Sequence, residues 1–267
     1  MIHASAYPET HMYALKHFSP TIISILAIVA LLSHGPIAQP ADYHAFADTR
    51  PLLSLPNALD VLSNVGFLLV GVWGLWTLKS IPNTAPSSTI RSACFAFMLA
   101  LTLTAFGSGY YHLAPDNARL VWDRLPIALA CGALLVGGFA ETHRQTHKFA
   151  LLFMLATAVI SVIWWAASER RGVGDLRPYL ALQAAPLILI PLWQWASDKP
   201  TRDRAAFGCA IALYILAKIA ELNDAHIHAL LSVVSGHALK HILASLAALV
   251  LVAEMLRKLQ TPCIATR

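Results

Sequence analysis

The chain has 267 residues, of which 57% are hydrophobic and only 12% are charged, and its formal net charge is +5. A soluble globular domain has about 25% charged residues, so this composition excludes an ordinary soluble protein and indicates a polytopic membrane protein. No basic run interleaved with aromatic residues is present, which argues against nucleic-acid binding.

Eight apolar stretches of about membrane-spanning length follow one another along the chain, separated by short connections. Only helices and closed barrels can satisfy their backbone groups in lipid, and long uninterrupted apolar runs are typical of helices. The sequence therefore predicts an all-α polytopic membrane bundle. The stretches cover residues 20–37, 57–78, 92–113, 121–140, 149–167, 178–196, 205–222 and 237–256.

The first stretch is predicted to be an additional helix in front of a seven-helix core. We expect residues 1–41 to form an N-terminal cytoplasmic segment with this extra membrane helix, residues 42–258 to form the core, and residues 259–267 to form a short cytoplasmic tail. The alternative for the first stretch is the hydrophobic region of a signal peptide. Gln39 and Pro40, however, interrupt the small-residue pattern of a cleavage site.

Lysines and arginines are distributed unevenly between the two sides of an eight-span arrangement. The richer side holds both termini, and cytoplasmic loops carry an excess of these residues, so both termini are predicted to be cytoplasmic. The loops that contain Asp48, Pro115–Leu120 and Asn223–Gly236 then face outward, with His112 and His237 at the same end. These features fit a multi-pass protein of a bacterial inner membrane.

Two histidines stand at the start of the last stretch, in the run Ser-Gly-His-Ala-Leu-Lys-His that ends at His241. His237 and His241 are four positions apart, so they project from one face of a helix. A pair at this spacing can ligate one metal ion. The alternative is two polar side chains that form hydrogen bonds between helices.

A second polar group ends the third stretch, in the run Gly-Ser-Gly-Tyr-Tyr-His that begins at Gly107. Ser108 and His112 share a helix face at the same spacing. Gly107 and Gly109 are small enough to let a neighbouring backbone approach closely. The alternative is a glycine-rich helix contact with a serine that is hydrogen-bonded to its own helix.

Asp123 opens the following stretch after a short turn. It could be a charge favoured by the helix N-terminus or an ion-pair partner of Arg124. Ionisable groups at the edge of membrane spans are nevertheless costly and usually functional. Three imidazoles with an open fourth position are the ligand set of a catalytic zinc. Together with His112, His237 and His241, Asp123 therefore predicts an intramembrane metal-dependent hydrolase.

This spaced pattern resembles that of the alkaline ceramidase family, which belongs to the CREST superfamily of seven-helix membrane hydrolases and related receptors. The five residues of the pattern are Ser108, His112, Asp123, His237 and His241.

A stretch further upstream also carries the resemblance. Residues Asn57–Asn64, followed by Phe67, are similar to the start of the family's first core helix. The match spans roughly residues 42–256, so only the N-terminal segment is additional.

The resemblance implies a zinc ion bound by His112, His237 and His241, with a water molecule in the fourth position. It also implies that Ser108 and Asp123 lie close to that water. The family cleaves the amide bond of ceramides and releases a sphingoid base and a fatty acid. The implied substrate is therefore a membrane lipid, reached from the bilayer, and the implied activity is that of a hydrolase acting on linear amide C–N bonds.

The chain departs from the family at two places. Animal members bind calcium in an acidic, tryptophan-containing loop before the first core helix, whereas residues 42–50 contain no tryptophan and Asn57 stands at the expected glutamate. A calcium site is therefore doubtful. Lys240 replaces an apolar or aromatic residue inside the last histidine motif, and we expect it to extend toward the interface or to pair with Glu221 or Asp224.

In the predicted mechanism, Asp123 orients or deprotonates the water and passes its proton to the leaving amine, while Ser108 donates a hydrogen bond to the developing oxyanion. Lys218 is expected to form an ion pair with Glu221. Two alternatives stay open, namely a hydrolase of another membrane amide or ester and a non-enzymatic, receptor-like zinc-binding protein. The polar residues beside the last motif are predicted to support the site: Glu221, Asn223, Asp224, His226 and His228.

Overall fold

The computed structural model of the chain describes residues 7–82, 88–143 and 149–260. This part consists of helices and connections and contains no strand, which confirms the predicted all-α fold. The helices are α1 (Tyr7–His34), α2 (Ala58–Leu62), α3 (Val65–Ser80), α4 (Ser88–Leu113), α5 (Asn117–His143), α6 (Ala150–Arg170), α7 (Arg177–Ala196), α8 (Thr201–Leu222), α9 (Asp224–Leu231) and α10 (Gly236–Gln260).

Eight helical segments of this part are long and apolar enough to cross a membrane, which identifies the chain as an integral membrane protein. They correspond one to one with the eight apolar stretches predicted from the sequence, and α2 and α3 together form the second of them. The large apolar side chains on their outer faces are exposed, as expected for a surface that lipid covers.

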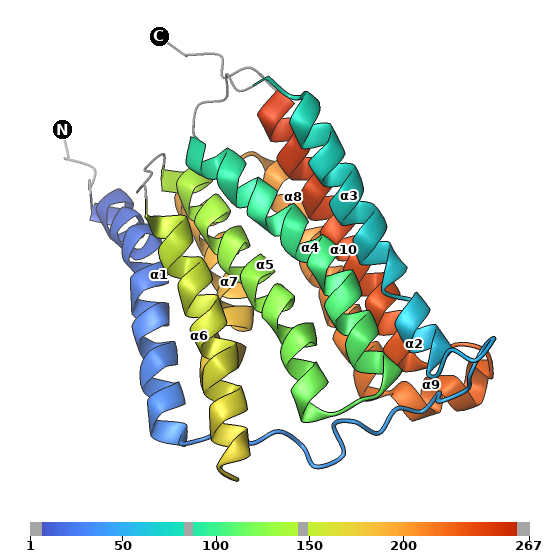
Figure 1. Ribbon diagram of the computed structural model, residues 1–267. Helices are drawn as coiled ribbons and strands as arrows, with labels where there is room; N and C mark the ends of the chain where they lie inside the picture. Colours follow the sequence, from blue (N-terminus) through green and yellow to red (C-terminus); the bar gives the residue numbers. More distant parts are fainter. Residues whose placement is uncertain (1–6, 83–87, 144–148, 261–267) are drawn as a thin grey trace, which may run out of the picture.

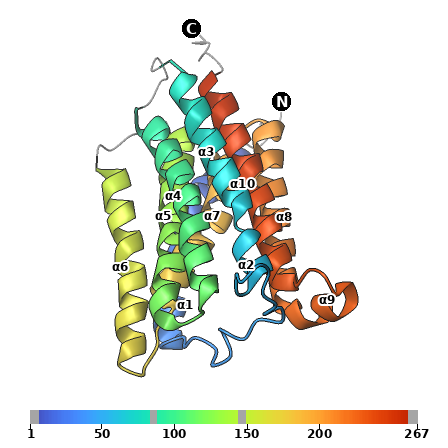
Figure 2. The ribbon, with the colours of Figure 1, turned by 45° about the vertical axis from the view of Figure 1, so that its right-hand side comes forward.

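α5 lies in the middle of the bundle, where it packs against α4 on one side and against α6 and α7 on the other (Figure 1). α10 packs against α8 and α3 and lies alongside both (Figure 2). One buried cluster around Met98 and Val252 joins α3, α4, α5 and α10. A second cluster around Trp165 joins α5, α6 and α7 with the segment that follows α1. The bundle therefore has two cores, and α5 contributes to both.

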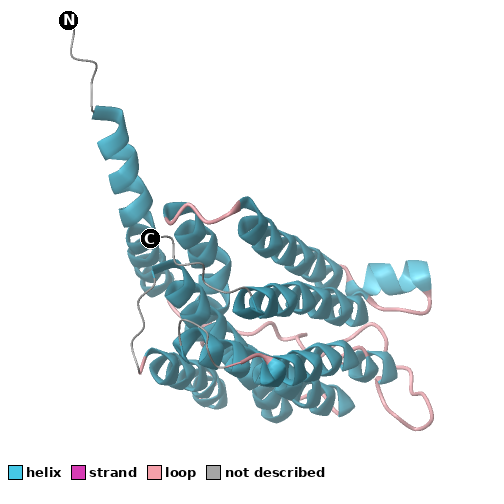
Figure 3. Ribbon diagram, turned by 90° about the horizontal axis from the view of Figure 1, so that it is seen from above, coloured by secondary structure: helices cyan, strands magenta, loops and turns pink. Residues whose placement is uncertain are grey.

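α1 lies at the edge of the bundle. It packs along α7, and only 6% of its membrane-spanning window is buried. Seen from above, its N-terminal part extends away from the other helices (Figure 3). The division into residues 1–41, 42–258 and 259–267 stays a prediction, and residues 261–267 lie outside the described part.

The structure corrects the predicted start of the fourth stretch. α5 begins at Asn117 rather than at residue 121, because the Asp116 side chain accepts a hydrogen bond from the backbone N–H of Arg119 at 2.7 Å and so caps the helix. Hydrophobicity alone misses this polar first turn. Asp123 therefore lies beyond the first turn, where the helix dipole no longer explains a carboxylate.

The structure also corrects the connection between α8 and α10, which the sequence predicts to be a loop. It contains α9, a helix of 8 residues, which is too short to produce a reliable periodic pattern. α9 projects sideways from the bundle near α2 (Figure 2).

The helix ends fall into two groups. The start of α1 and the end of α10 lie at one end of the bundle, which we call the terminal end (Figure 1). The connections 35–57, 114–116 and 223–235 lie at the opposite end, which we call the site end. The assignment of these ends to the cytoplasm and the exterior stays a prediction.

Candidate metal centre

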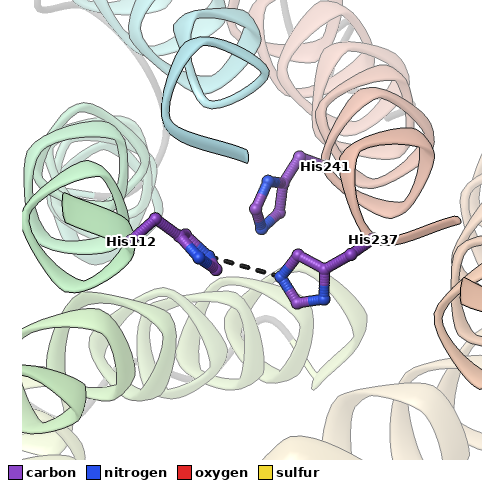
Figure 4. A group of neighbouring side chains, drawn as sticks. All are labelled: His112, His237 and His241. Atoms are coloured by element: carbon purple, nitrogen blue, oxygen red, sulfur yellow. Dashed lines mark hydrogen bonds between the residues drawn. The ribbon is translucent and has the colours of Figure 1, made fainter. Parts of the chain in front are cut away.

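Three buried histidines meet at the site end of the bundle. His112 comes from the last turn of α4, and His237 and His241 come from the first turns of α10. Their exposed fractions are 1%, 6% and 5%. One ring nitrogen from each lies within 4.8 Å of the others (Figure 4). The structure thus brings together residues that are more than a hundred positions apart in the sequence, and the group could hold a metal ion.

The facing nitrogens of this group have a spacing that suits a metal. The Nε2 atoms of His112 and His237 are 3.3 Å apart. Two nitrogens bound to one tetrahedral zinc at about 2.0–2.1 Å lie about 3.3–3.4 Å apart. The Nδ1 atom of His112 is buried and has no hydrogen-bond partner among the described residues. The donor set therefore fits a divalent metal that prefers nitrogen ligands, and its chemistry does not by itself identify which one.

The tautomer of His241 follows from its neighbours. The Ser63 hydroxyl donates a hydrogen bond to the backbone carbonyl of Asp60 at 3.1 Å, so its oxygen is left to accept one. The Nδ1 atom of His241 lies 2.8 Å from that oxygen and therefore carries the hydrogen. A hydrogen at Nδ1 leaves the lone pair of Nε2 free for a metal, which is the usual arrangement of a histidine ligand.

The start of α10 is fixed by three contacts that set the direction of its histidines. The Asp224 carboxylate accepts a hydrogen bond from the backbone N–H of His237 at 2.7 Å. The Ser235 hydroxyl accepts one from the backbone N–H of Ala238 at 3.0 Å. Gly236 packs so closely on the Ala220 carbonyl that a Cβ atom would clash with it. The helix can therefore begin only in this position.

Ser108 and Asp123 are brought together where α4 crosses α5. A Cβ atom on Gly107 would clash with the carbonyl oxygen of Trp122, so the glycine permits the close crossing that the sequence predicts. A Cβ atom on Gly109, in contrast, would fit without a clash, because its nearest neighbour, the side chain of Val61, would lie 3.9 Å away. Ser108 is buried and Asp123 is half-buried, and the close crossing of the two helices brings these positions near each other.

Lys240 joins the histidines to an acidic group. Its Nζ atom lies 2.8 Å from Oε1 of Glu221 and 3.0 Å from Nε2 of His237. The predicted ion pairs of Glu221 with Lys240 and with Lys218 are both confirmed, whereas Asp224 caps α10 instead. A metal ion at Nε2 of His237 would replace this hydrogen bond, while Glu221 would keep the ammonium group paired.

The two halves of the site are linked through α4. Ser108 lies one turn before His112 on the same face of that helix. The Ser108–Asp123 pair and the histidine cluster are therefore parts of one polar region at the site end.

Sequence reasoning missed three residues that hold this region in place. Ser63 accepts the hydrogen bond of His241, as described above. The Asn57 side chain donates a hydrogen bond to the backbone carbonyl of His112 at 2.7 Å. The ring centroid of Phe46 lies 4.4 Å from that of His237, so the loop after α1 covers the cluster. Asn57 and Ser63 belong to the stretch Asn57–Asn64 that carries part of the family resemblance, but neither was assigned a contact with the histidines from the sequence.

Of the five residues predicted to support the site, two have contacts there and three do not. The Asn223 side chain donates a hydrogen bond to the backbone carbonyl of Ile219 in α8. Glu221 and Asp224 bind Lys240 and the start of α10. His226 and His228 lie on α9 and are not part of the histidine group.

Arg50 connects the loop after α1 to the segment between α9 and α10. Arg50 donates to both carboxylate oxygens of Asp48 at 2.8 Å and also to the carbonyl oxygens of Ser232 and Val233. The guanidinium group of Arg50 lowers the pKa of Asp48 below its ordinary value. This contact holds Phe46 and its loop over the site end.

No protein-family model matches this chain, and no curated protein sequence matches it. The resemblance to alkaline ceramidases therefore rests on the five spaced residues and on the upstream stretch Asn57–Asn64 with Phe67.

Proposed function

We propose that the chain is a zinc-dependent intramembrane amide hydrolase that cleaves ceramide or a similar N-acylated lipid into a free amine and a fatty acid. The observation that carries this proposal is the convergence of three buried histidine nitrogens within 4.8 Å, with Ser108 one turn before His112 on α4 and Asp123 on the helix that crosses it.

The ligand set supports a catalytic rather than a structural metal site. His112, His237 and His241 provide three ligands, whereas structural zinc sites are closed by four protein ligands. A zinc ion held by these residues would bring the pKa of a bound water to about 7 and polarise a carbonyl group.

The chain's own residues would handle the proton. In amide hydrolysis a bond forms between the water oxygen and the carbonyl carbon, and the carbon–nitrogen bond then breaks. Asp123 takes the proton of the water and delivers it to the leaving nitrogen, which departs as a neutral amine. Ser108 donates a hydrogen bond to the carbonyl oxygen as negative charge develops on it.

The surroundings of the site favour a lipid substrate. The eight candidate spans carry exposed apolar side chains along their length, so a substrate with long hydrocarbon chains can reach the bundle from the bilayer. In the orientation that the basic residues indicate, this would be the outer leaflet of a bacterial inner membrane.

A receptor-like protein without catalytic activity is the second candidate. It would bind zinc through the same three histidines but release no fatty acid, so the turnover measurement below separates it from the hydrolase. A hydrolase of another lipid amide or of a lipid ester is a variant of the first candidate and would use the same residues.

Hydrolysis by the purified chain in lipid nanodiscs tests the proposal. We expect release of fatty acid from N-dodecanoyl sphingosine, loss of this activity with a zinc chelator, and its return when zinc is restored. Asp123→Asn should lower turnover by about 10²–10⁴-fold but keep the metal, and His237→Ala should lose both. Asp198→Asn, at an exposed carboxylate of the terminal end, is the matched control. Undiminished turnover in both site variants would overturn the mechanism.

A further inference from the structure

Arg124 is a buried cation without an anionic partner. It follows Asp123 on α5, and its exposed fraction is 2%. The sequence leaves Asp123 as a potential ion-pair partner, but Arg124 forms no ion pair with any residue that the structure describes. A guanidinium group cannot lose its proton in a protein, so the charge stays in the interior.

Aromatic rings surround this guanidinium group. Its central carbon lies 3.9 Å from the ring centroid of Trp165, 5.0 Å from that of Tyr43 and 5.3 Å from that of Tyr179. These faces attract the cation, by about 2 kcal/mol for a well-placed desolvated ring. They do not satisfy its in-plane N–H groups.

Most N–H groups of Arg124 and the N–H group of Trp165 have no hydrogen-bond acceptor among the described residues. Gln39 accepts one hydrogen bond from Nη2 of Arg124 at 2.8 Å. The Nε and Nη1 atoms of Arg124 and the Nε1 atom of Trp165 are buried and have no acceptor among the described residues. All three unsatisfied groups are donors, and the site carries a positive charge. The missing partner is therefore an anion with oxygen acceptors.

The size of the imbalance argues against packing alone. Removing an unpaired charge from water is strongly unfavourable, and each unsatisfied buried donor adds to that cost. Aromatic contacts offset only part of this sum. The far end of the same helix shows the usual solution, because Glu141 pairs with Lys258 at 2.6 Å.

We propose that Arg124 and Trp165 form a binding site for the oxyanion group of a lipid-like ligand, beside the candidate metal centre. A chain of contacts leads from Arg124 to the histidines: Tyr43, one of the rings around Arg124, packs against His44. His44 lies within hydrogen-bond distance of Tyr111, whose ring is 4.8 Å from that of His112. A carboxylate or phosphate oxygen held there would accept the free N–H groups and neutralise the charge. If the proposed hydrolase function is correct, this group is the carboxylate of the released fatty acid or an anionic headgroup of the substrate.

Thermal unfolding of the detergent-purified, chelator-treated chain tests the anion site apart from metal and catalysis. The probes are octanoate, octanol of the same chain length, and inorganic phosphate. At an octanoate concentration about 100-fold above its dissociation constant, we expect the Tm to rise by about 5 °C or more. Octanol should give no comparable shift. A response to phosphate as well would assign the site to headgroup phosphates, and a response to octanoate alone would assign it to carboxylates.

Two arginines on α5 provide the matched pair of variants. Arg124→Met should abolish the octanoate shift, and its own Tm without ligand should be unchanged or higher, because replacing an unpaired buried charge by an apolar side chain is neutral or stabilising. Arg119→Met should keep the shift, since Arg119 is partly exposed and paired with Asp116. Trp165→Phe keeps the ring, removes one donor, and should weaken octanoate binding several-fold without unfolding the bundle.

The proposal is overturned if neither octanoate nor phosphate shifts the wild-type Tm, or if the shift persists unchanged in Arg124→Met. A lowered Tm of Arg124→Met with no anion effect in the wild type would assign Arg124 to packing alone. The measurement uses metal-free protein, so it can fail separately from the test of the proposed function. A Tm shift with octanoate but no lipid hydrolysis would contradict the proposed function and support the anion site. Lipid hydrolysis without any Tm shift would support the proposed function and contradict the anion site.

Discussion

At the terminal end of the bundle, cations and carboxylates are matched. Lys258 of α10 lies 2.6 Å from Glu141 of α5 and 3.2 Å from Asp203 of α8. Arg257 lies 3.0 Å from Asp203 and 2.6 Å from Glu254. These pairs connect three helices, and each charge in the network faces a charge of opposite sign.

At the site end, several buried polar atoms have no hydrogen-bond partner among the described residues. They include Nδ1 of His112 and two nitrogens of Arg124, as well as the acceptors Oδ2 of Asp60 and Oδ1 of Asn64. Helix packing does not require such groups, and each of them costs stability when buried. The contrast indicates that the terminal end holds the bundle together, whereas the site end is built for ligands that bring oxygen, a metal or both.

Gly107→Ala should have the largest effect, because it attacks the helix crossing that forms the site. The added methyl group would meet the backbone of Trp122, and a rigid carbonyl cannot move aside, so we expect a loss of about 3 kcal/mol in the free energy of unfolding. Gly109→Ala is the control, since its nearest neighbour lies at 3.9 Å. Equal effects of the two variants in chemical unfolding would contradict the crossing described here.

Ser63→Ala separates ligand binding from stability at the site end. Removing the acceptor of His241 frees the ring to rotate or change tautomer, so we expect the affinity for zinc to fall by about 10–100-fold. Ser245→Ala is the control on α10, because that hydroxyl bonds only to its own helix, at Ile242. Titration with zinc and a competing chelator measures both; an unchanged affinity in Ser63→Ala would remove Ser63 from the site.

Lys258→Met should lower the stability of the terminal end without changing metal binding at the site end. It leaves Glu141 without its 2.6 Å partner, and we expect a loss of about 1 kcal/mol in unfolding free energy, typical of a partly exposed pair. Metal content and affinity should equal those of the wild type. A loss of metal in this variant would show that the two ends are not independent.

The smallest effect is expected from Asp48→Asn, which loosens the loop over the site end. Arg50 lowers the pKa of Asp48 in the folded chain, so the ion pair stabilises the fold above the unfolded-state pKa and this contribution is lost as the pH falls through the folded-state pKa. The half-exposed Arg50 limits it to less than about 1 kcal/mol. The stability difference from the wild type should be fully present at neutral pH, begin to shrink below about pH 4 and disappear as the pH falls through the folded-state pKa of Asp48; a difference of the same size in strong acid would contradict this account.

The sequence predicts the spans and the histidine cluster for a clear physical reason. Membrane-length apolar runs have few alternative structures, and an even number of short-connected spans returns His112 and His237 to the same end. The four-residue spacing of His237 and His241 then requires no knowledge of tertiary structure. The resemblance to a family was not needed to bring the three residues together.

Other features depend on contacts that no local pattern encodes. The hydrogen bond of Ser63 to His241 joins residues 178 positions apart. From the sequence, Lys240 could form an ion pair with either Glu221 or Asp224. Asp224 instead accepts a hydrogen bond from the backbone N–H of His237 at the start of α10. The unpaired state of Arg124 is visible only in the structure, where Asp123 forms no ion pair with it.

Metal content per chain tests the central claim most directly. The wild type and the His237→Ala/His241→Ala double variant would be purified in detergent, supplied with zinc, freed of excess and measured by inductively coupled plasma mass spectrometry, with Lys258→Met as the control for stability. We predict about one zinc per chain in the wild type and the control, and none in the double variant. No bound zinc in a well-folded wild type, or the same amount in the double variant, would contradict the metal centre.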